Sequence, residues 1–128
     1  MKTAGGKRIP GPIYKLAEIQ RKLKVGQFHL YEKRAGSVLR GLNKCTDREA
    51  RKIATKLLAA LTDADYAHSL ETENGLKQDV YGQIVEGEGW YFKIDMSDPN
   101  QPAIASCHPA EHDLKTMKGV VRKSPWGF

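Results

Sequence analysis

The 128-residue sequence has no run of apolar residues long enough to span a bilayer. Its first residues, MKTAGGKRIPGP, also lack the apolar stretch of a signal peptide, so we interpret residues 1–11 as a flexible, basic lead segment. Only two cysteines occur, Cys45 and Cys107. Without an export signal, we expect both to be free thiols in a cytoplasmic protein. The length and the 40% share of hydrophobic residues suit one domain with a modest core.

Charge is distributed unevenly along the chain, whose formal net charge is +6. Residues 1–60 contain 15 Lys and Arg against four Asp and Glu, whereas residues 61–128 contain six against eleven. A basic half beside an acidic half predicts one surface that attracts a polyanion. Nucleic acid is the commonest polyanionic partner and an acidic protein is another. The alternative is a solvated, lysine-rich helix surface without a partner.

Helical spacing of apolar residues dominates the first half. Leu16, Ile19 and Leu23 predict a helix over residues 12–25, and Gly26 follows it as a C-terminal cap. Two shorter elements are expected next, an extended piece at residues 28–32 and a short helix at residues 36–42.

Two capping sequences follow. TDRE, residues 46–49, is a capping box, and the apolar stripe behind it predicts a core-packed helix over residues 47–61. TDAD, residues 62–65, has the same pattern, so we expect a second short helix that ends near residue 70.

In the second half of the chain, apolar residues recur at every second position, which is typical of strands. We expect strands over residues 78–84, 90–96 and 103–107, separated by turn residues, and therefore an antiparallel meander covered by the 47–61 helix. Helices followed by strands predict an α+β fold in which N-terminal helices pack on a small antiparallel β-sheet.

The stretch SCHPAEHDL contains Cys107, His108, Glu111 and His112, and three interpretations of it are open. HPAEH matches H-x-x-E-H, in which two histidines bind zinc and a glutamate activates water, although Pro109 disfavours helical backbone at His108. A structural zinc site would need four ligands, and the remaining Cys and His residues are isolated. In the third interpretation the strand ends at His108, which suits acid–base chemistry near neutral pH, and Glu111 and His112 have no role.

Four segments occur in the order found in the MqsR-type toxins: DADYAHSLE, QDVYG, GWYFKI and AIASCH. The chain resembles this family over roughly residues 13–108, which implies a RelE-like ribonuclease toxin domain at residues 12–108 and an extension of undetermined structure at residues 109–128. These toxins of type II toxin–antitoxin systems cleave mRNA by attack of the RNA's own 2′-hydroxyl, without a metal. The resemblance therefore implies two partners, a cognate antitoxin and single-stranded mRNA, and no cofactor or membrane.

The resemblance also implies which residues act. A glutamine and a tyrosine of the family fall on Gln78 and Tyr91, whereas two family lysines fall on His68 and His108. Two histidines would supply the base and the acid of RNA cleavage, provided that they meet in space. Candidate RNA-binding residues are Lys93, Tyr81, Lys22, Lys24 and Arg34.

The sequence thus predicts a metal-independent endoribonuclease, an mRNA interferase that acts as a toxin. Two alternatives are open. One is a non-catalytic nucleic-acid-binding or regulatory module of the same fold, and the other is a toxin that cleaves mRNA only on the ribosome.

Overall fold

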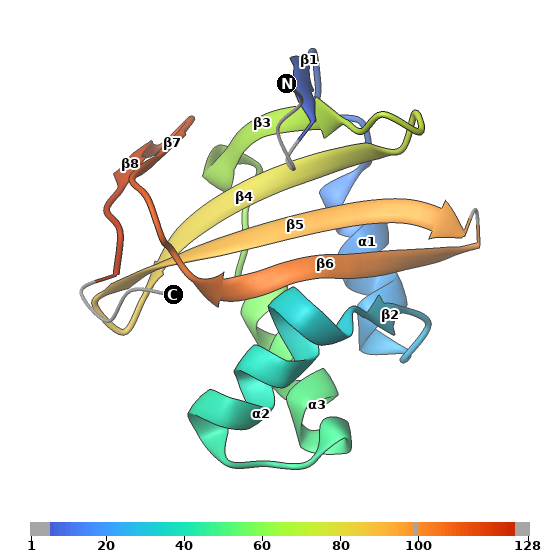
Figure 1. Cartoon of the computed structure of the whole chain (residues 1–128), viewed down its shortest axis with the longest axis vertical. Helices are drawn as coiled ribbons and strands as arrows, with labels where there is room; N and C mark the ends of the chain where they lie inside the picture. The colour runs from blue at the N-terminus through green and yellow to red at the C-terminus, as the bar shows by residue number, and fades with distance from the viewer. Residues whose placement is uncertain (1–5, 99, 125–128) are drawn as a thin grey trace.

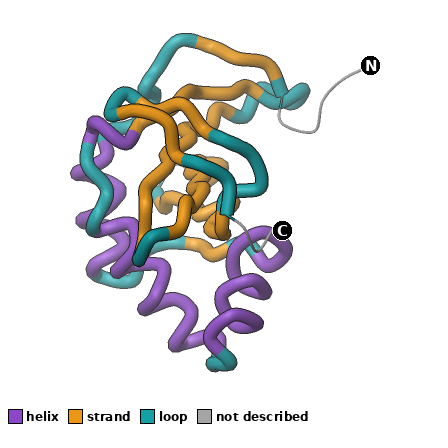
Figure 2. Tube along the Cα trace, turned by 90° about the vertical axis from the view of Figure 1, so that its left-hand side faces the viewer, coloured by secondary structure: helices purple, strands orange, loops and turns teal. Residues whose placement is uncertain are grey.

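A mixed six-stranded sheet with helices on one face organises the chain, whose computed structural model describes residues 6–98 and 100–124. Figure 1 shows the helices below and behind the strands, and in Figure 2 they lie to the left of the strands and below them. The strand order is β1-β3-β4-β5-β6-β2. The strands are β1 (Lys7–Ile9), β2 (His29–Leu30), β3 (Tyr66–Glu71), β4 (Lys77–Val85), β5 (Glu88–Asp98) and β6 (Gln101–Pro109).

The α+β class and the β4-β5-β6 antiparallel meander are confirmed. Two details of the predicted architecture are wrong. The sheet is not purely antiparallel, because β2 pairs with β6 in parallel, and the helices are not all N-terminal, because β1 precedes them. Strands of two or three residues leave almost no periodicity in a sequence, so only their pairing partners define them.

The predicted flexible lead is also corrected over part of its length. Lys7–Ile9 forms an edge strand, and its register with β3 runs from Lys7 opposite Glu71 to Ile9 opposite Ser69. Residues 1–5 lie outside the described part of the chain.

Three α-helices are present in the described residues: α1 (Leu16–Lys24), α2 (Ser37–Asn43) and α3 (Asp47–Ala59). A short π-helical segment, η1 (Glu32–Gly36), leads into α2. The first helix begins four residues later than predicted, because the backbone N–H groups of Ile13 and Tyr14 donate to the Asp79 carboxylate instead, at 3.0 and 2.9 Å. The predicted cap is confirmed: Gly26 has φ +80° and donates to the Leu23 carbonyl at 3.0 Å.

The first capping box is confirmed. Thr46 Oγ1 accepts from the Glu49 N–H at 3.2 Å, and Glu49 Oε1 accepts from the Thr46 N–H at 3.0 Å. At the second box, the Thr62 N–H donates to Asp65 Oδ2 at 2.8 Å, yet only a 3₁₀ turn forms, η2 (Asp63–Asp65). The helix predicted beyond it is wrong, because β3 begins at Tyr66 and pairs on both sides, with β1 and β4.

The main core lies between the helices and the sheet. Alternation along β5 directs Trp90, Phe92 and Ile94 to this side, where they cluster with α3 residues Ala54 and Leu58. Cys107 belongs to the same cluster, and burial raises the pKa of its thiol. Both cysteines are free, as predicted.

The C-terminal extension folds onto the opposite face of the sheet. Residues of β7 (Leu114–Thr116) pair with β8 (Gly119–Val121) as a separate hairpin. Leu114 and Val121 form a second apolar cluster with Leu70 and Val80 of the sheet. This hairpin lies against β3 and β4. No helix within residues 6–98 and 100–124 is long and apolar enough to cross a membrane.

Candidate functional site

A groove of about 470 Å³ lies beside the C-terminal hairpin, on the face of the sheet that the helices leave open. We call it the β5–β6 groove. Two neighbouring strands contribute the side chains Tyr91, Lys93, Ser106 and His108. Other segments contribute Arg34, Glu111, His112, Asp113 and Leu114. A cavity of this size is typical of sites for small molecules or nucleotides.

Strand alternation explains why these side chains share a face. Because Phe92 points into the core, Tyr91 and Lys93 point the other way. The register places Tyr91 opposite His108 and Lys93 opposite Ser106. The alternation of β6 therefore separates His108, at the groove, from Cys107, in the core.

His108 is held as a neutral imidazole. Its Nδ1 lies 2.8 Å from the Pro109 carbonyl oxygen, which only accepts, so Nδ1 carries the proton. Nε2 then carries the lone pair and accepts from Arg34 Nη2 at 3.1 Å. Burial lowers the pKa of His108, and the nearby cations Arg34 and Lys93 act in the same direction, while the Pro109 hydrogen bond and Glu111 oppose this shift. His108 as a whole is 2% exposed, and its ring stacks on Tyr91 at a centroid distance of 5.2 Å.

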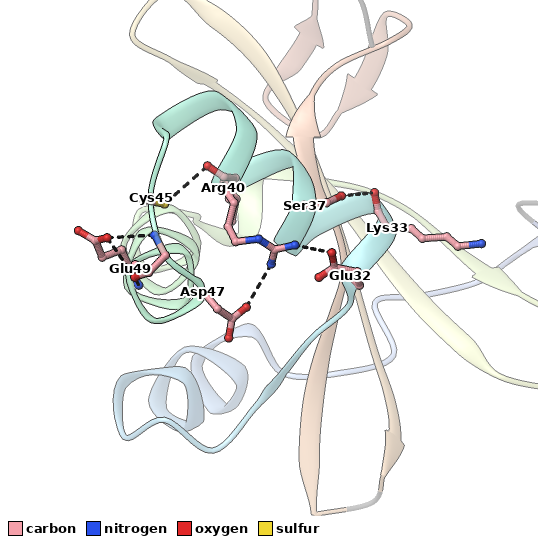
Figure 3. A network of polar contacts seen from close by, with 9 residues as sticks. Glu32, Lys33, Ser37, Arg40, Cys45, Asp47 and Glu49 are labelled. Atoms are coloured by element: carbon pink, nitrogen blue, oxygen red, sulfur yellow. Dashed lines mark hydrogen bonds and ion pairs between the residues drawn. The ribbon is translucent and has the colours of Figure 1, made fainter.

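Arg34 is fixed from several directions. It forms an ion pair with Glu111, which lies in the loop after β6. The η1 segment that carries it is tied to the helices through Arg40, which binds Glu32 of η1 and Asp47 of α3 (Figure 3). The guanidinium therefore reaches the β5–β6 groove from a braced segment.

Lys93 is the second cation of the groove. Its ammonium lies 5.9 Å from the centre of the Tyr91 ring, and no carboxylate in residues 6–98 and 100–124 forms an ion pair with it. Burial lowers the pKa of Lys93; Arg34 adds to this shift and Asp95 opposes it. A partly desolvated cation without an ion-pair partner favours an anionic ligand.

His68 faces the same side but lies outside the groove. The register runs from His68 on β3 through Val80 and Lys93 to Ser106 on β6, so three strand spacings, roughly 14 Å, separate the strands of the two histidines. The structure therefore does not bring His68 and His108 together as an acid–base pair. Burial, followed by Arg8 and Lys93, lowers the pKa of His68 to about 4.

Two further predicted site residues, Gln78 and Tyr81, lie on opposite faces of the sheet. Gln78 is buried, with Nε2 3.4 Å from Asp95 Oδ2, and it lies outside the residues that line the groove. Tyr81, a candidate RNA-binding residue, is 2% exposed and packs against Tyr66 in the core rather than facing the groove.

Lys22 and Lys24 lie on α1, in the helical layer behind the sheet. Lys22 donates to the Asn100 carbonyl at 2.8 Å, and Lys24 borders a separate basic groove with residues of α3. Neither lysine lines the β5–β6 groove, so any contact with RNA there would occur at a second surface.

The described residues do not provide the group of metal-binding side chains that either zinc interpretation requires. Within the described part of the chain, no three His, Cys, Asp or Glu side chains are grouped so that they could hold a metal ion. Cys107 points into the core, away from His108, and Glu111 is engaged by Arg34.

Sequence reasoning missed His112. The chain bends at Glu111 and His112 and returns as β7, which places His112 at the same groove as His108. Four residues of separation do not predict this return. The only signal in the sequence is the cluster of polar residues after the strand.

The fold and the groove define an α+β protein with a basic, histidine-containing site on an open sheet face. No protein-family model matches the chain, and no curated protein matches it.

Proposed function

We propose that the protein is a metal-independent endoribonuclease of the RelE-like, MqsR-type class, and that it cleaves single-stranded mRNA in the β5–β6 groove. The observation that carries this proposal is the convergence of Arg34, Lys93 and His108 on one groove. Two cations suit the phosphodiester, and a neutral imidazole suits abstraction of a proton.

In this mechanism the 2′-hydroxyl gives its proton to His108 Nε2 and its oxygen attacks the adjacent phosphorus. Arg34 donates to this nitrogen in the free protein, and the incoming phosphate would draw the guanidinium onto its non-bridging oxygens. Lys93 would stabilise the charge that develops on the same oxygens. Tyr91 supports the imidazole by stacking on it.

As a toxin the enzyme would be inhibited by a cognate antitoxin, an expectation that comes from the family resemblance. Ribosome-dependent cleavage is the variant in which the same chemistry needs a translated message.

One observation favours the non-catalytic alternative. Nε2 of His108 is occupied by Arg34, and the second predicted histidine, His68, is three strands away. A protein that binds RNA with Arg34 and Lys93 but never frees the imidazole would be a binding module.

Cleavage of a long, unstructured RNA in EDTA tests the proposal. We expect 2′,3′-cyclic phosphate ends, and we expect His108→Ala to lose about 10²–10⁴-fold in rate, which is the usual contribution of one acid–base group. His29→Ala is the matched control, because His29 is exposed and lies near Asp98 at the other end of the sheet. Salt-sensitive RNA binding without cleavage, with or without translating ribosomes, would favour the binding module.

A further inference from the structure

The loop after β6 places a second histidine at the groove. His112 lies at the bend between β6 and β7, and it lines the β5–β6 groove together with His108, Lys93 and Arg34. The adjacent Asp113 fixes the loop by accepting from the Lys123 N–H at 2.8 Å. Leu114, the first residue of β7, anchors it in the second apolar cluster.

The two histidines of the groove differ in what their nitrogens do. Both nitrogens of His108 are engaged, Nδ1 with the Pro109 carbonyl and Nε2 with Arg34. His112 is exposed, and within residues 6–98 and 100–124 no hydrogen bond or ion pair engages its ring. Its imidazole is therefore accessible to solvent and to a ligand, whereas that of His108 is buried and biased toward the neutral form.

RNA cleavage needs one group that accepts a proton and one group that donates a proton. The base must be neutral before the reaction, and the acid must carry a proton for the departing 5′-oxygen. His108 suits the role of the base. His68 lies three strands away, so it cannot serve as the acid beside His108, and the acid must be another residue.

We propose that His112 is the general acid of the β5–β6 groove and protonates the 5′-oxygen that leaves during RNA cleavage. This inference rests on the proposed ribonuclease function.

The step balances as follows. The bond between the 2′-oxygen and phosphorus forms while the bond between phosphorus and the 5′-oxygen breaks. The 2′-hydroxyl proton goes to Nε2 of His108, and one proton of the His112 imidazolium goes to the 5′-oxygen. The products are a 2′,3′-cyclic phosphate and a 5′-hydroxyl, and no oxidant or metal is required. Proton return through water restores the two imidazoles.

The charged groups that face His112 come from three segments. Arg34 of η1 and Lys93 of β5 are cationic and line the same groove. Glu111 and Asp113 flank it in the loop, and both are already paired, with Arg34 and with Arg122. A bound phosphodiester would add negative charge to this set and would lie beside the His112 ring.

The test compares two dinucleotide-containing RNA substrates, one with the natural 5′-oxygen at the scissile bond and one with sulfur in its place. A thiolate leaves without protonation, so the sulfur substrate does not need a general acid. We expect His112→Ala to slow cleavage of the oxygen substrate about 10²-fold or more, and to cleave the sulfur substrate at nearly the wild-type rate. The alkaline limb of the pH–rate profile should disappear in the same variant.

Two variants serve as references. His108→Ala should slow both substrates, because the base is needed whatever leaves, and His29→Ala should behave as wild type. Equal losses on both substrates in His112→Ala, or no loss on either, would overturn the assignment of His112. If the wild-type protein cleaves neither substrate, the proposed function fails and the role of His112 fails with it.

Discussion

Acid should destabilise the folded protein through His68. The pKa of this side chain is lowered to about 4, chiefly because it is buried and then because Arg8 and Lys93 are close. In the unfolded chain the same histidine titrates near its ordinary value of about 6.5. Between these two values the unfolded chain binds a proton at His68 and the folded protein does not. Stability is therefore present above the unfolded pKa and is lost as the pH falls toward the folded one.

The slope of the free energy of unfolding against pH gives the magnitude of this loss of stability. One such proton is worth up to about 1.4 kcal/mol per pH unit, or up to about 3 kcal/mol over the whole window. His68 is only partly buried and solvent screens its neighbours, so we expect about 1–2 kcal/mol from it. The lowered pKa of His108 contributes in the same direction, which makes a variant comparison necessary.

Urea unfolding at about pH 7 and about pH 4.5, on the wild type and on His68→Gln, measures this contribution. The free energy of unfolding should fall less in the variant, by the amount attributed to His68. An NMR titration of the His68 ring should give the lowered pKa directly. Equal pH dependence in wild type and His68→Gln would refute the reasoning.

Three further predictions concern the fold that carries the groove. Thr46→Ala removes the capping-box acceptor and should lower the free energy of unfolding by about 1 kcal/mol, measured by denaturant titration with Thr55→Ala, inside the same helix, for comparison. Phe92→Ala leaves a cavity in the core and should cost about 3–5 kcal/mol; a loss below about 1 kcal/mol would show that the core is not packed around it. Gly89→Ala would place a Cβ onto the Arg122 carbonyl oxygen, so hydrogen exchange should accelerate in β7 and β8 while β4 and β5 stay protected. Unchanged exchange in the hairpin would contradict that contact.

Local sequence patterns predicted the structure correctly wherever interactions between neighbouring residues determine it. The Thr46–Glu49 capping box, the stripe behind it and the Gly26 cap involve atoms only a few residues apart, and all three are present. The strand predicted over residues 90–96 is also present, and its alternation separates core-facing Phe92 from Tyr91 and Lys93, because side chains on a strand alternate between faces.

The same local reasoning failed where a distant partner decides. The capping box at Thr62 is present, but pairing of Tyr66–Glu71 with β1 and β4 replaces the expected helix with a strand. Tyr81 lies in QDVYG, where Val80 and Tyr81 are both apolar, and only the packing of α3 selects which one faces the main core.

The residues of the candidate site also fall into two groups, those placed by a local sequence pattern and those placed by distant partners. The sequence by itself determined that His108 lies near the end of a strand and faces away from Cys107, because a period of two fixes which face each side chain takes. The tertiary structure decided which side chains meet it. Strand order places β4 and β5 between His68 and His108, while η1 brings Arg34 and the return of β7 brings His112 to the same groove. Proximity across strands and loops depends on chain topology, which no short stretch of residues encodes.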